Sequence, residues 1–234
     1  MRKVLILGAT APAEGDPPVW IVEHGGKLLI EQIAEACAPL DAQPIFAMLK
    51  SDSRRHHLAG IARLAAPTCA VVEIEAQTQG AACTALLCID HIEADDELVI
   101  MNANEIIDAD LAAIAEGFRT RSLDAGVVTF PSLHPRYSYV LLDEEGRVVQ
   151  AAEKRPISRS AIAGFFWFRK GADFVAAAQA MIRKDAKVDD HFFVSLTLNE
   201  LILNQQTVGV HEIEPRRYQP LKSSRQVLHY ETES

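Results

Sequence analysis

The sequence lacks any apolar run long enough to cross a membrane. Its apolar stretches, such as Val4–Leu7 and Val99–Met101, have the length of single β-strands, whereas a membrane-spanning helix needs about 20 apolar residues. The first of them follows Arg2 and Lys3 and stops at Gly8, so it is better interpreted as a buried strand than as a signal peptide. We therefore expect a cytoplasmic protein that has no membrane partner.

Cysteine is also scarce, and the four cysteines show no metal-binding or disulfide pattern. Cys37, Cys69, Cys83 and Cys88 form no Cys-x-x-Cys motif, and no histidine accompanies them at the spacing of a zinc site. We expect reduced, buried thiols, which are typical of cytosolic proteins. The spacing of the serines, histidines and cysteines likewise indicates no Ser-His-Asp or Cys-His arrangement for nucleophilic catalysis.

Positive charge is in deficit. The chain carries 23 Lys and Arg against 32 Asp and Glu, a formal net charge of −9. This balance argues against a dedicated nucleic-acid-binding protein, which would show a basic stripe. A small anion such as a nucleoside triphosphate stays possible, because one local cluster of donors can bind it on an acidic protein.

Alternating strands and helices fill the first half of the chain. At 234 residues and 49% hydrophobic, the chain can bury a full core, and we expect a single domain over residues 1–234. Periodicity predicts strands over Lys3–Leu7, Gln43–Leu49, Thr68–Ile74 and Glu97–Met101. It predicts helices over Leu28–Ala38, Ser53–Ala65 with Ser53 as N-cap, Gly80–Ile89, and Ala109–Arg121 with Asp108 as cap. This alternation indicates a three-layer α/β/α fold with a parallel sheet.

The second half adds antiparallel strands to this sheet. Tyr139–Leu142 and Val148–Glu153 flank the turn sequence Asp143–Gly146, which predicts a hairpin. Asp124–Phe130, Ile162–Phe168 and Thr207–Ile213 read as further strands, and Ala172–Lys184, Phe192–Asn204 and Leu221–Tyr230 as helices. The sheet should therefore be mixed. Ligands of such sheets bind at the carboxyl ends of the strands, which directs attention to the loops Gly8–Gly26, Glu75–Gly80 and Asn102–Asp108.

Segments of the first half resemble the nucleotidyltransferase family of GT-A fold. The similar segments are the loop that opens with Leu7-Gly8-Ala9, Glu23–Glu31, Thr78–Leu86 and Leu98–Glu105, in the family's order. The resemblance implies an α/β fold of GT-A type with a mixed sheet. It also implies nucleotide contacts from Leu7, Gly8, Ala9, Thr10, Thr78, Gln79, Gly80 and Asn102.

Three later segments continue the resemblance. His134–Ser138, Ala152–Pro156 and Ala163–Phe168 are most similar to the branch found in bacterial surface-polysaccharide pathways. In that branch Arg136, Glu153 and Gly164 would bind the substrate, and Lys154 would touch the phosphate of a sugar phosphate. The implied partners are a nucleoside triphosphate or nucleotide sugar and a small phosphorylated acceptor; a homo-oligomer is also compatible with the sequence.

The family's reaction joins a sugar phosphate to the α-phosphorus of a nucleoside triphosphate and releases pyrophosphate with the help of Mg²⁺. The resemblance places Asn104, Lys154 and Asp190 in catalytic positions, and Asn104 and Asp190 at the metal. The chain departs from the family where phosphate would be handled. Its loop contains Pro12, Glu14 and Asp16 in place of glycines and an arginine, the family's Pro-Lys pair is Pro18-Val19, and the metal aspartate is Asn104.

Several of these residues also have ordinary structural interpretations. Asp108 fits a helix cap, and Asp189 and Asp190 fit solvated charges before a helix. Lys154 and Arg155 fit an exposed ion pair at a strand end, Gly80 fits a glycine that opens a helix, and Arg136 fits a turn. Trp20 fits either a ring that stacks on a ligand or an anchor that covers the loop. Phe165 and Trp167 should pack on one face of their strand, and Phe166 and Phe168 on the other.

Three functions follow from these observations. The first is an active nucleotidyltransferase that makes a nucleotide-activated sugar for polysaccharide biosynthesis. The second is a catalytically impaired paralogue that binds a nucleotide or nucleotide sugar, because all three departures remove or invert charge that handles phosphate. The third is a GT-A glycosyltransferase, against which the sequence Asn102-Ala103-Asn104 stands in place of a metal-binding Asp-x-Asp.

Overall fold

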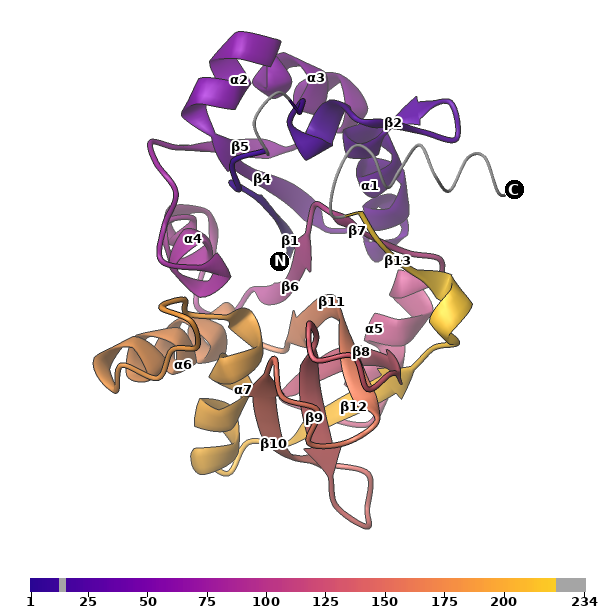
Figure 1. Ribbon diagram of the computed structural model, residues 1–234, viewed down its shortest axis with the longest axis vertical. Helices are drawn as coiled ribbons and strands as arrows, with labels where there is room; N and C mark the ends of the chain where they lie inside the picture. The colour runs from indigo at the N-terminus through magenta and orange to yellow at the C-terminus, as the bar shows by residue number, and fades with distance from the viewer. Residues whose placement is uncertain (13–15, 222–234) are drawn as a thin grey trace.

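A mixed β-sheet forms the centre of the molecule (Figure 1). The structure is a computed structural model and describes residues 1–12 and 16–221. Within these residues nine strands pair in the order β10-β9-β11-β6-β1-β4-β5, while β8 pairs with β11 and β12 pairs with β8. The strands are β1 Arg2–Gly8, β4 Gln43–Leu49, β5 Ala70–Ile74, β6 Glu97–Asn102, β8 Ala125–Pro131, β9 Ser138–Leu142, β10 Val148–Glu153, β11 Ser160–Phe168 and β12 Val208–Glu212.

The predicted division of the sheet is confirmed. Strand β1 is parallel to β4 and β6, and β4 is parallel to β5. From β11 onward the pairing changes: β11 is antiparallel to β6 and β8, and β9 and β10 form the predicted antiparallel hairpin. Strands β1 and β4 read as nearly continuous apolar runs because helices cover both of their faces.

Helices form a layer on each side of the sheet, so the predicted three-layer architecture is confirmed. On one face α1 (Leu29–Cys37), α3 (Leu58–Ala65) and α5 (Leu111–Thr120) share a core with Val4 and Ile6. On the other face α4 (Ala81–Leu86), α6 (Gly171–Arg183) and α7 (Val194–Leu203) pack with Leu5 and Leu7. The side chains of β11 divide as predicted, with Phe165 and Trp167 in the first core and Phe166 and Phe168 in the second.

One predicted helix is divided, and two predicted caps are wrong. The helix predicted over 53–65 is two helices, α2 (Lys50–His56) and α3, because His57 takes a left-handed conformation with φ +55°. Ser53 is not an N-cap: it is buried within α2, and its Oγ donates to Glu73 Oε1 of β5 at 2.7 Å. Asp108 is not the cap of α5 either; Asp110 is, because its Oδ1 accepts the backbone N–H of Ala113 at 2.9 Å.

Short elements at the strand ends complete the fold. The predicted loop 8–26 contains a 3-10 turn, Val19–Ile21, and the hairpin of β2 (Glu23–His24) and β3 (Lys27–Leu28). Beyond β6, β7 (Glu105–Ile107) pairs with β13 (Tyr218–Pro220), which the sequence analysis did not predict. The helix predicted over Leu221–Tyr230 lies, apart from its first residue, outside the described residues. In the part of the chain that is described, every helix is too short or too polar to traverse a lipid bilayer.

An ion pair ties the start of β6 to the end of α5. Arg119 donates from Nε and Nη2 to the two carboxylate oxygens of Glu97, each at 2.7 Å, and both side chains are mostly buried. Burial alone would raise the pKa of Glu97, but the hydrogen bonds and charge of Arg119 outweigh it and hold the pKa below its usual value of 4.5. The folded protein therefore releases this proton more readily than the unfolded chain does.

Arg119→Met should lower the free energy of unfolding by about 2 kcal/mol at pH 7, because it leaves the Glu97 carboxylate mostly buried without its cation. A carboxyl whose pKa is lowered by folding stabilises the protein above its unfolded pKa and loses this contribution as the pH falls. The gap between wild type and variant should therefore narrow below about pH 4.5. Urea unfolding at several pH values measures it. Glu116→Gln, which removes only the exposed partner of Arg119, should cost under about 1 kcal/mol.

Candidate functional site

Pairing of β1 with β6 brings the predicted nucleotide-binding residues of these two strands together. In the register of β1 and β6, Leu7 lies opposite Asn102, and the backbone N–H of Ala103 donates to Leu7 O at 2.9 Å. Both strands are parallel and end at the same edge of the sheet, where ligands of such folds bind. Ala9 is half-buried and Thr10 is exposed where the chain leaves β1.

Gly8, the last residue of β1, is covered by the indole ring of Trp20. The ring lies so close that a Cβ on Gly8 would be 1.9 Å from one of its carbons. Trp20 is 1% exposed and meets the Phe46 ring edge-on, with centroids 5.8 Å apart. Of the two interpretations left open by the sequence, the structure favours the anchor that covers the loop. The indole Nε1 is buried and has no hydrogen-bond partner among residues 1–12 and 16–221.

The predicted second nucleotide turn, residues 78–80, packs against the segment that precedes α7. Gly80 has φ +114°, and a Cβ there would lie 2.4 Å from the backbone oxygen of Phe192. Phe192 N donates to Gln79 O at 2.8 Å, and Ala82 N donates to Phe192 O at 3.1 Å. Thr78 Oγ1 donates to Gly80 O and lies 2.7 Å from Thr84 Oγ1. A close approach of protein backbone therefore explains this glycine.

The segment before α7 also reaches the predicted catalytic lysine. Lys154 Nζ pairs with Asp189 Oδ2 at 2.8 Å and lies 5.5 Å from the centre of the Phe193 ring. The hydrogen bond and charge of Lys154 hold the pKa of Asp189 below its usual range. Of the interpretations left open, the exposed ion pair is present in the structure, and it joins the end of β10 to residues 188–193.

Glu153, predicted to bind substrate, points into the protein. It is 8% exposed, and its Oε2 accepts hydrogen bonds from Ser138 Oγ and, at 2.8 Å, from Ser195 Oγ. These contacts join β9, β10 and α7. A carboxylate held in this way fixes the backbone of the neighbouring Lys154 more directly than it can reach a ligand.

A second carboxylate, Glu105, lies at the start of β7, shortly after the end of β6. Asn102 Nδ2 donates to Glu105 Oε2 at 3.2 Å. The same oxygen covers Gly164, where a Cβ would lie 1.5 Å from it, and Gly164 has φ +70°. Burial and the neighbouring Glu105 carboxylate raise the pKa of Tyr218 well above its usual value. The carboxylate that the fold places on this edge is therefore Glu105, next to the predicted position Asn104.

Arg136 supplies positive charge beside this cluster. Its guanidinium lies 4.7 Å from the centre of the Tyr137 ring and donates to the Tyr137 hydroxyl. Tyr137 in turn packs edge-on against Phe130 and Tyr218, with centroids 5.0 and 5.9 Å away. Arg136 is exposed, so this predicted substrate-binding cation packs on the buried Tyr137 ring and is also accessible to solvent.

The predicted metal residues make a poor donor set for Mg²⁺. Asn104 offers a neutral amide, and Asp190 Oδ1 lies 3.7 Å from the ammonium of Lys187. Over residues 1–12 and 16–221, no three His, Cys, Asp or Glu side chains gather as a metal site would require. The structure gives Asn104 and Asp190 no support as a resident metal site, and their metal role stays a prediction.

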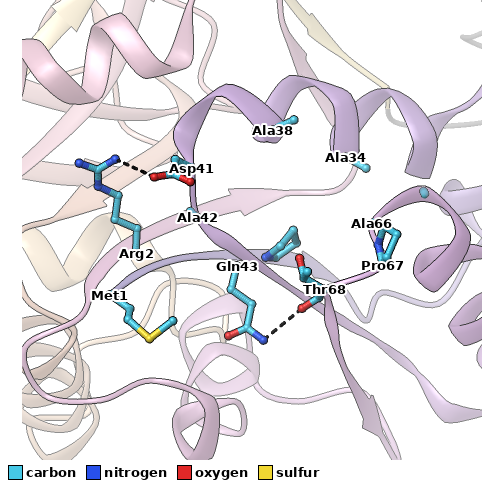
Figure 2. A pocket seen from close by; sticks show the side chains of 12 residues that line it. Met1, Arg2, Ala34, Ala38, Asp41, Ala42, Gln43, Ala66, Pro67 and Thr68 are labelled. Atoms are coloured by element: carbon cyan, nitrogen blue, oxygen red, sulfur yellow. Dashed lines mark hydrogen bonds and ion pairs between the residues drawn. The ribbon is translucent and has the colours of Figure 1, made fainter.

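A cleft of about 720 Å³ lies elsewhere, where β1 and β4 begin (Figure 2). Arg2 on its wall lies 3.8 Å from Asp41, and Gln43 Nε2 donates to Thr68 O at 3.1 Å. None of the predicted site residues lines it. Because ligands of open α/β sheets bind at the opposite, carboxyl ends of the strands, this cleft is separate from the candidate site.

Comparison with known proteins identifies the family. The family described as nucleotidyl transferase matches residues 17–206. The chain belongs to the nucleotidyl transferase family. No curated protein sequence matches it.

Solved structures of this fold cover almost the whole chain. A nucleoside-diphosphate-sugar pyrophosphorylase from Vibrio cholerae RC9 has a TM-score of 0.83 and 16% identity, with 97% of this chain and 98% of that chain covered. A protein assigned as a glucose-1-phosphate thymidylyltransferase from Bacillus anthracis, in complex with a sucrose, has a TM-score of 0.76, 14% identity and coverage of 99% and 94%. A UDP-glucose pyrophosphorylase complexed with UDP-glucose has a TM-score of 0.74, 13% identity and full coverage of both chains.

These comparisons confirm the predicted family and fold class. At 13–16% identity the similarity of the structures concerns the fold, so the roles of individual residues stay predictions. Sequence reasoning named Trp20 as one possible cover of the loop, and Glu105 stood out by its position directly after Asn104. It missed the contact of the indole with Gly8, the position of the Glu105 carboxylate over Gly164, and Tyr218 beside Glu105.

Proposed function

We propose that the chain transfers a nucleotidyl group from a nucleoside triphosphate to a sugar phosphate or a similar small phosphorylated acceptor. The observation that supports this most is the assembly of the family's separate segments along one edge of the sheet. Leu7 and Asn102 pair there, and Gly80 meets the segment that carries Asp189, which contacts Lys154. Membership of the nucleotidyl transferase family, matched over residues 17–206, supports nucleotidyl transfer as the reaction at this edge.

The reaction needs positioning and neutralisation of charge more than covalent help from the protein. A phosphate oxygen of the acceptor forms a bond to the α-phosphorus, the bond from that phosphorus to the bridging oxygen breaks, and pyrophosphate leaves. On the acceptor side, Arg136 and Lys154 are the cations that this edge offers. On the triphosphate side, the sequence has no Lys or Arg between Gly8 and Val22, so charge there must come from elsewhere.

This shortage favours a second candidate function, a paralogue that binds a nucleotide or nucleotide sugar without transferring it efficiently. Trp20 covering Gly8 and the neutral Asn104 point the same way. The role of a glycosyltransferase receives no support from the family match. A place in surface-polysaccharide biosynthesis is part of the proposal and rests on the resemblance of residues 134–138, 152–156 and 163–168.

Melting temperatures of the purified chain should rise with one nucleoside triphosphate in a panel of triphosphates and nucleotide sugars. A ligand at about 100 times its Kd stabilises a protein by roughly 2.7 kcal/mol, a shift of a few degrees at this size. A shift that needs Mg²⁺, together with pyrophosphate release in the presence of sugar phosphates, is the expected result for the transferase. A shift without Mg²⁺, seen with nucleotide sugars and without pyrophosphate release, would support the binding paralogue. No shift with any ligand would contradict both.

The double variant Val19→Lys, Asn104→Asp sharpens this experiment. It adds a cation to the loop after β1 and a carboxylate at the end of β6, so it should bind the triphosphate more tightly in the presence of Mg²⁺. Val149→Lys adds the same cation to β10, where Val149 is exposed, and should leave affinity unchanged. Val19→Lys alone adds the same single charge as Val149→Lys, whereas the double variant adds no net charge. Equal effects of these two single variants would mean that net charge, not this edge, controls binding.

A further inference from the structure

Lys154 and Asp189 meet although 35 residues separate them. Lys154 directly follows the last residue of β10, and Asp189 lies in the segment between α6 and α7. Their side chains join at 2.8 Å between Nζ and Oδ2. The pair therefore depends on two parts of the fold that come together only after the sheet and its second helical layer have formed.

The backbone fixes both residues in place. Lys154 N donates to Tyr137 O at 3.0 Å, and Val188 and His191 exchange backbone hydrogen bonds of 3.0 and 2.9 Å around Asp189. Lys154 has φ +54° and Asp189 has φ +48°, a backbone conformation that residues other than glycine rarely take. Backbone hydrogen bonds thus hold the main chain of both residues, and rotation of the side chains alone is enough to open or close the pair.

The pair is nevertheless easy to open. The Lys154 side chain is 41% exposed and that of Asp189 is 67% exposed, and ion pairs of this kind stabilise a protein little. Phe193 lies on one side of the ammonium, 5.5 Å from it, and Asp189 contacts the ammonium at 2.8 Å. An anion that replaces Asp189 would therefore bind beside the Phe193 ring. A phosphate carries more charge than a carboxylate and binds ammonium groups strongly.

We propose that Asp189 is a positioning residue that holds the Lys154 ammonium until the phosphate of the acceptor takes its place. The inference rests on the proposed function, because that function supplies the phosphorylated acceptor. Asp189 acts as an internal competitor: it occupies the Lys154 ammonium in the free protein and lowers the apparent affinity for phosphate according to the fraction of time that the pair is closed. A phosphate that binds Lys154 releases the Asp189 carboxylate to solvent.

Asp189→Asn should raise the affinity for inorganic phosphate and for glucose 1-phosphate about two- to fivefold, the range that a surface ion pair is worth. Asparagine keeps the size of the side chain and accepts a positive φ readily, so the fold should be unchanged. Isothermal titration calorimetry of the full chain, without nucleotide or metal, measures the affinity. Lys154→Gln alone should bind phosphate more weakly than the wild type. When Lys154→Gln is combined with Asp189→Asn, the gain in phosphate affinity should disappear.

Asp185→Asn is the matched control. Asp185 also has a positive φ, +53°, and an exposed carboxylate, and it pairs with Lys187 at 3.1 Å. It should leave phosphate affinity unchanged, which separates the contact with Lys154 from a general loss of negative charge. A merely structural role of Asp189 would lower the affinity when the pair is removed, whereas competition raises it.

Three results would overturn the inference: equal affinity in wild type and Asp189→Asn, an equal gain in Asp185→Asn, or no phosphate binding in any variant. The measurement is independent of nucleotide. Phosphate binding that follows the expected order without pyrophosphate release would leave Asp189 as described and refute the transferase. Pyrophosphate release together with a phosphate affinity that is the same in wild type and Asp189→Asn would support the transferase and refute the role of Asp189.

Discussion

Gly80→Ala should lower the free energy of unfolding by about 3–5 kcal/mol. A Cβ at this position would lie 2.4 Å from the backbone oxygen of Phe192 and 2.7 Å from its nitrogen, and backbone atoms cannot rotate away as a side chain can. The φ of +114° adds strain of about 1–3 kcal/mol for any residue with a Cβ. The hydrogen bonds from Phe192 N to Gln79 O and from Ala82 N to Phe192 O would lengthen, at about 1 kcal/mol each.

Gly117→Ala provides the control for this substitution. Gly117 lies within α5, and a Cβ there would meet no atom of the described residues within 4 Å. Alanine should therefore stabilise the protein by about 0.5–1 kcal/mol, the usual gain in a helix. Urea unfolding of both variants tests the contrast, and similar values for the two would show that the turn and the segment before α7 do not pack as described.

The fold could be predicted from the sequence where burial dictates the pattern. Strands β1 and β4 are covered on both faces, so their apolar runs gave nearly correct bounds. In β11, alternation placed Phe165 and Phe166 on opposite faces, as observed. The break at His57 was not predicted, because the left-handed conformation is uncommon for any residue other than glycine, even for histidine, which is enriched there. Ser53 resembled a helix cap locally, but its hydroxyl donates a hydrogen bond to Glu73 of strand β5.

The candidate site could be predicted only in outline. Resemblance placed Leu7, Asn102 and Gly80 at strand ends and turns, and the sheet register brings the first two together. It could not show what occupies the space over the glycines. In this protein, that space is filled by protein atoms: the Trp20 ring over Gly8 and the Glu105 carboxylate over Gly164. Such contacts depend on how loops pack in three dimensions, which residue spacing does not record.

Trp20→Ala should cost about 3–5 kcal/mol of unfolding free energy, the usual range when a large buried aromatic side chain is removed. The ring is 1% exposed and fills the space between Gly8 and Phe46, and a backbone glycine cannot move in to close the gap. Trp20→Phe should cost clearly less, because it keeps an aromatic ring against Phe46 and because the indole Nε1 has no hydrogen bond to lose within the described part of the chain. Urea unfolding with circular dichroism measures both variants without relying on tryptophan fluorescence.

The two variants also decide which interpretation of Trp20 is right. An anchor that covers the loop predicts a large loss of stability in Trp20→Ala, and ligand binding that survives in Trp20→Phe. A ring that stacks on the nucleotide predicts the opposite order: nearly unchanged stability in Trp20→Ala and a lost melting response to nucleotide. If removal of the ring instead strengthened the nucleotide response of the folded protein, the indole would be a plug over Gly8. Weak nucleotide binding by the loop after β1 would then result from the Trp20 side chain as much as from the absence of Lys and Arg in the loop.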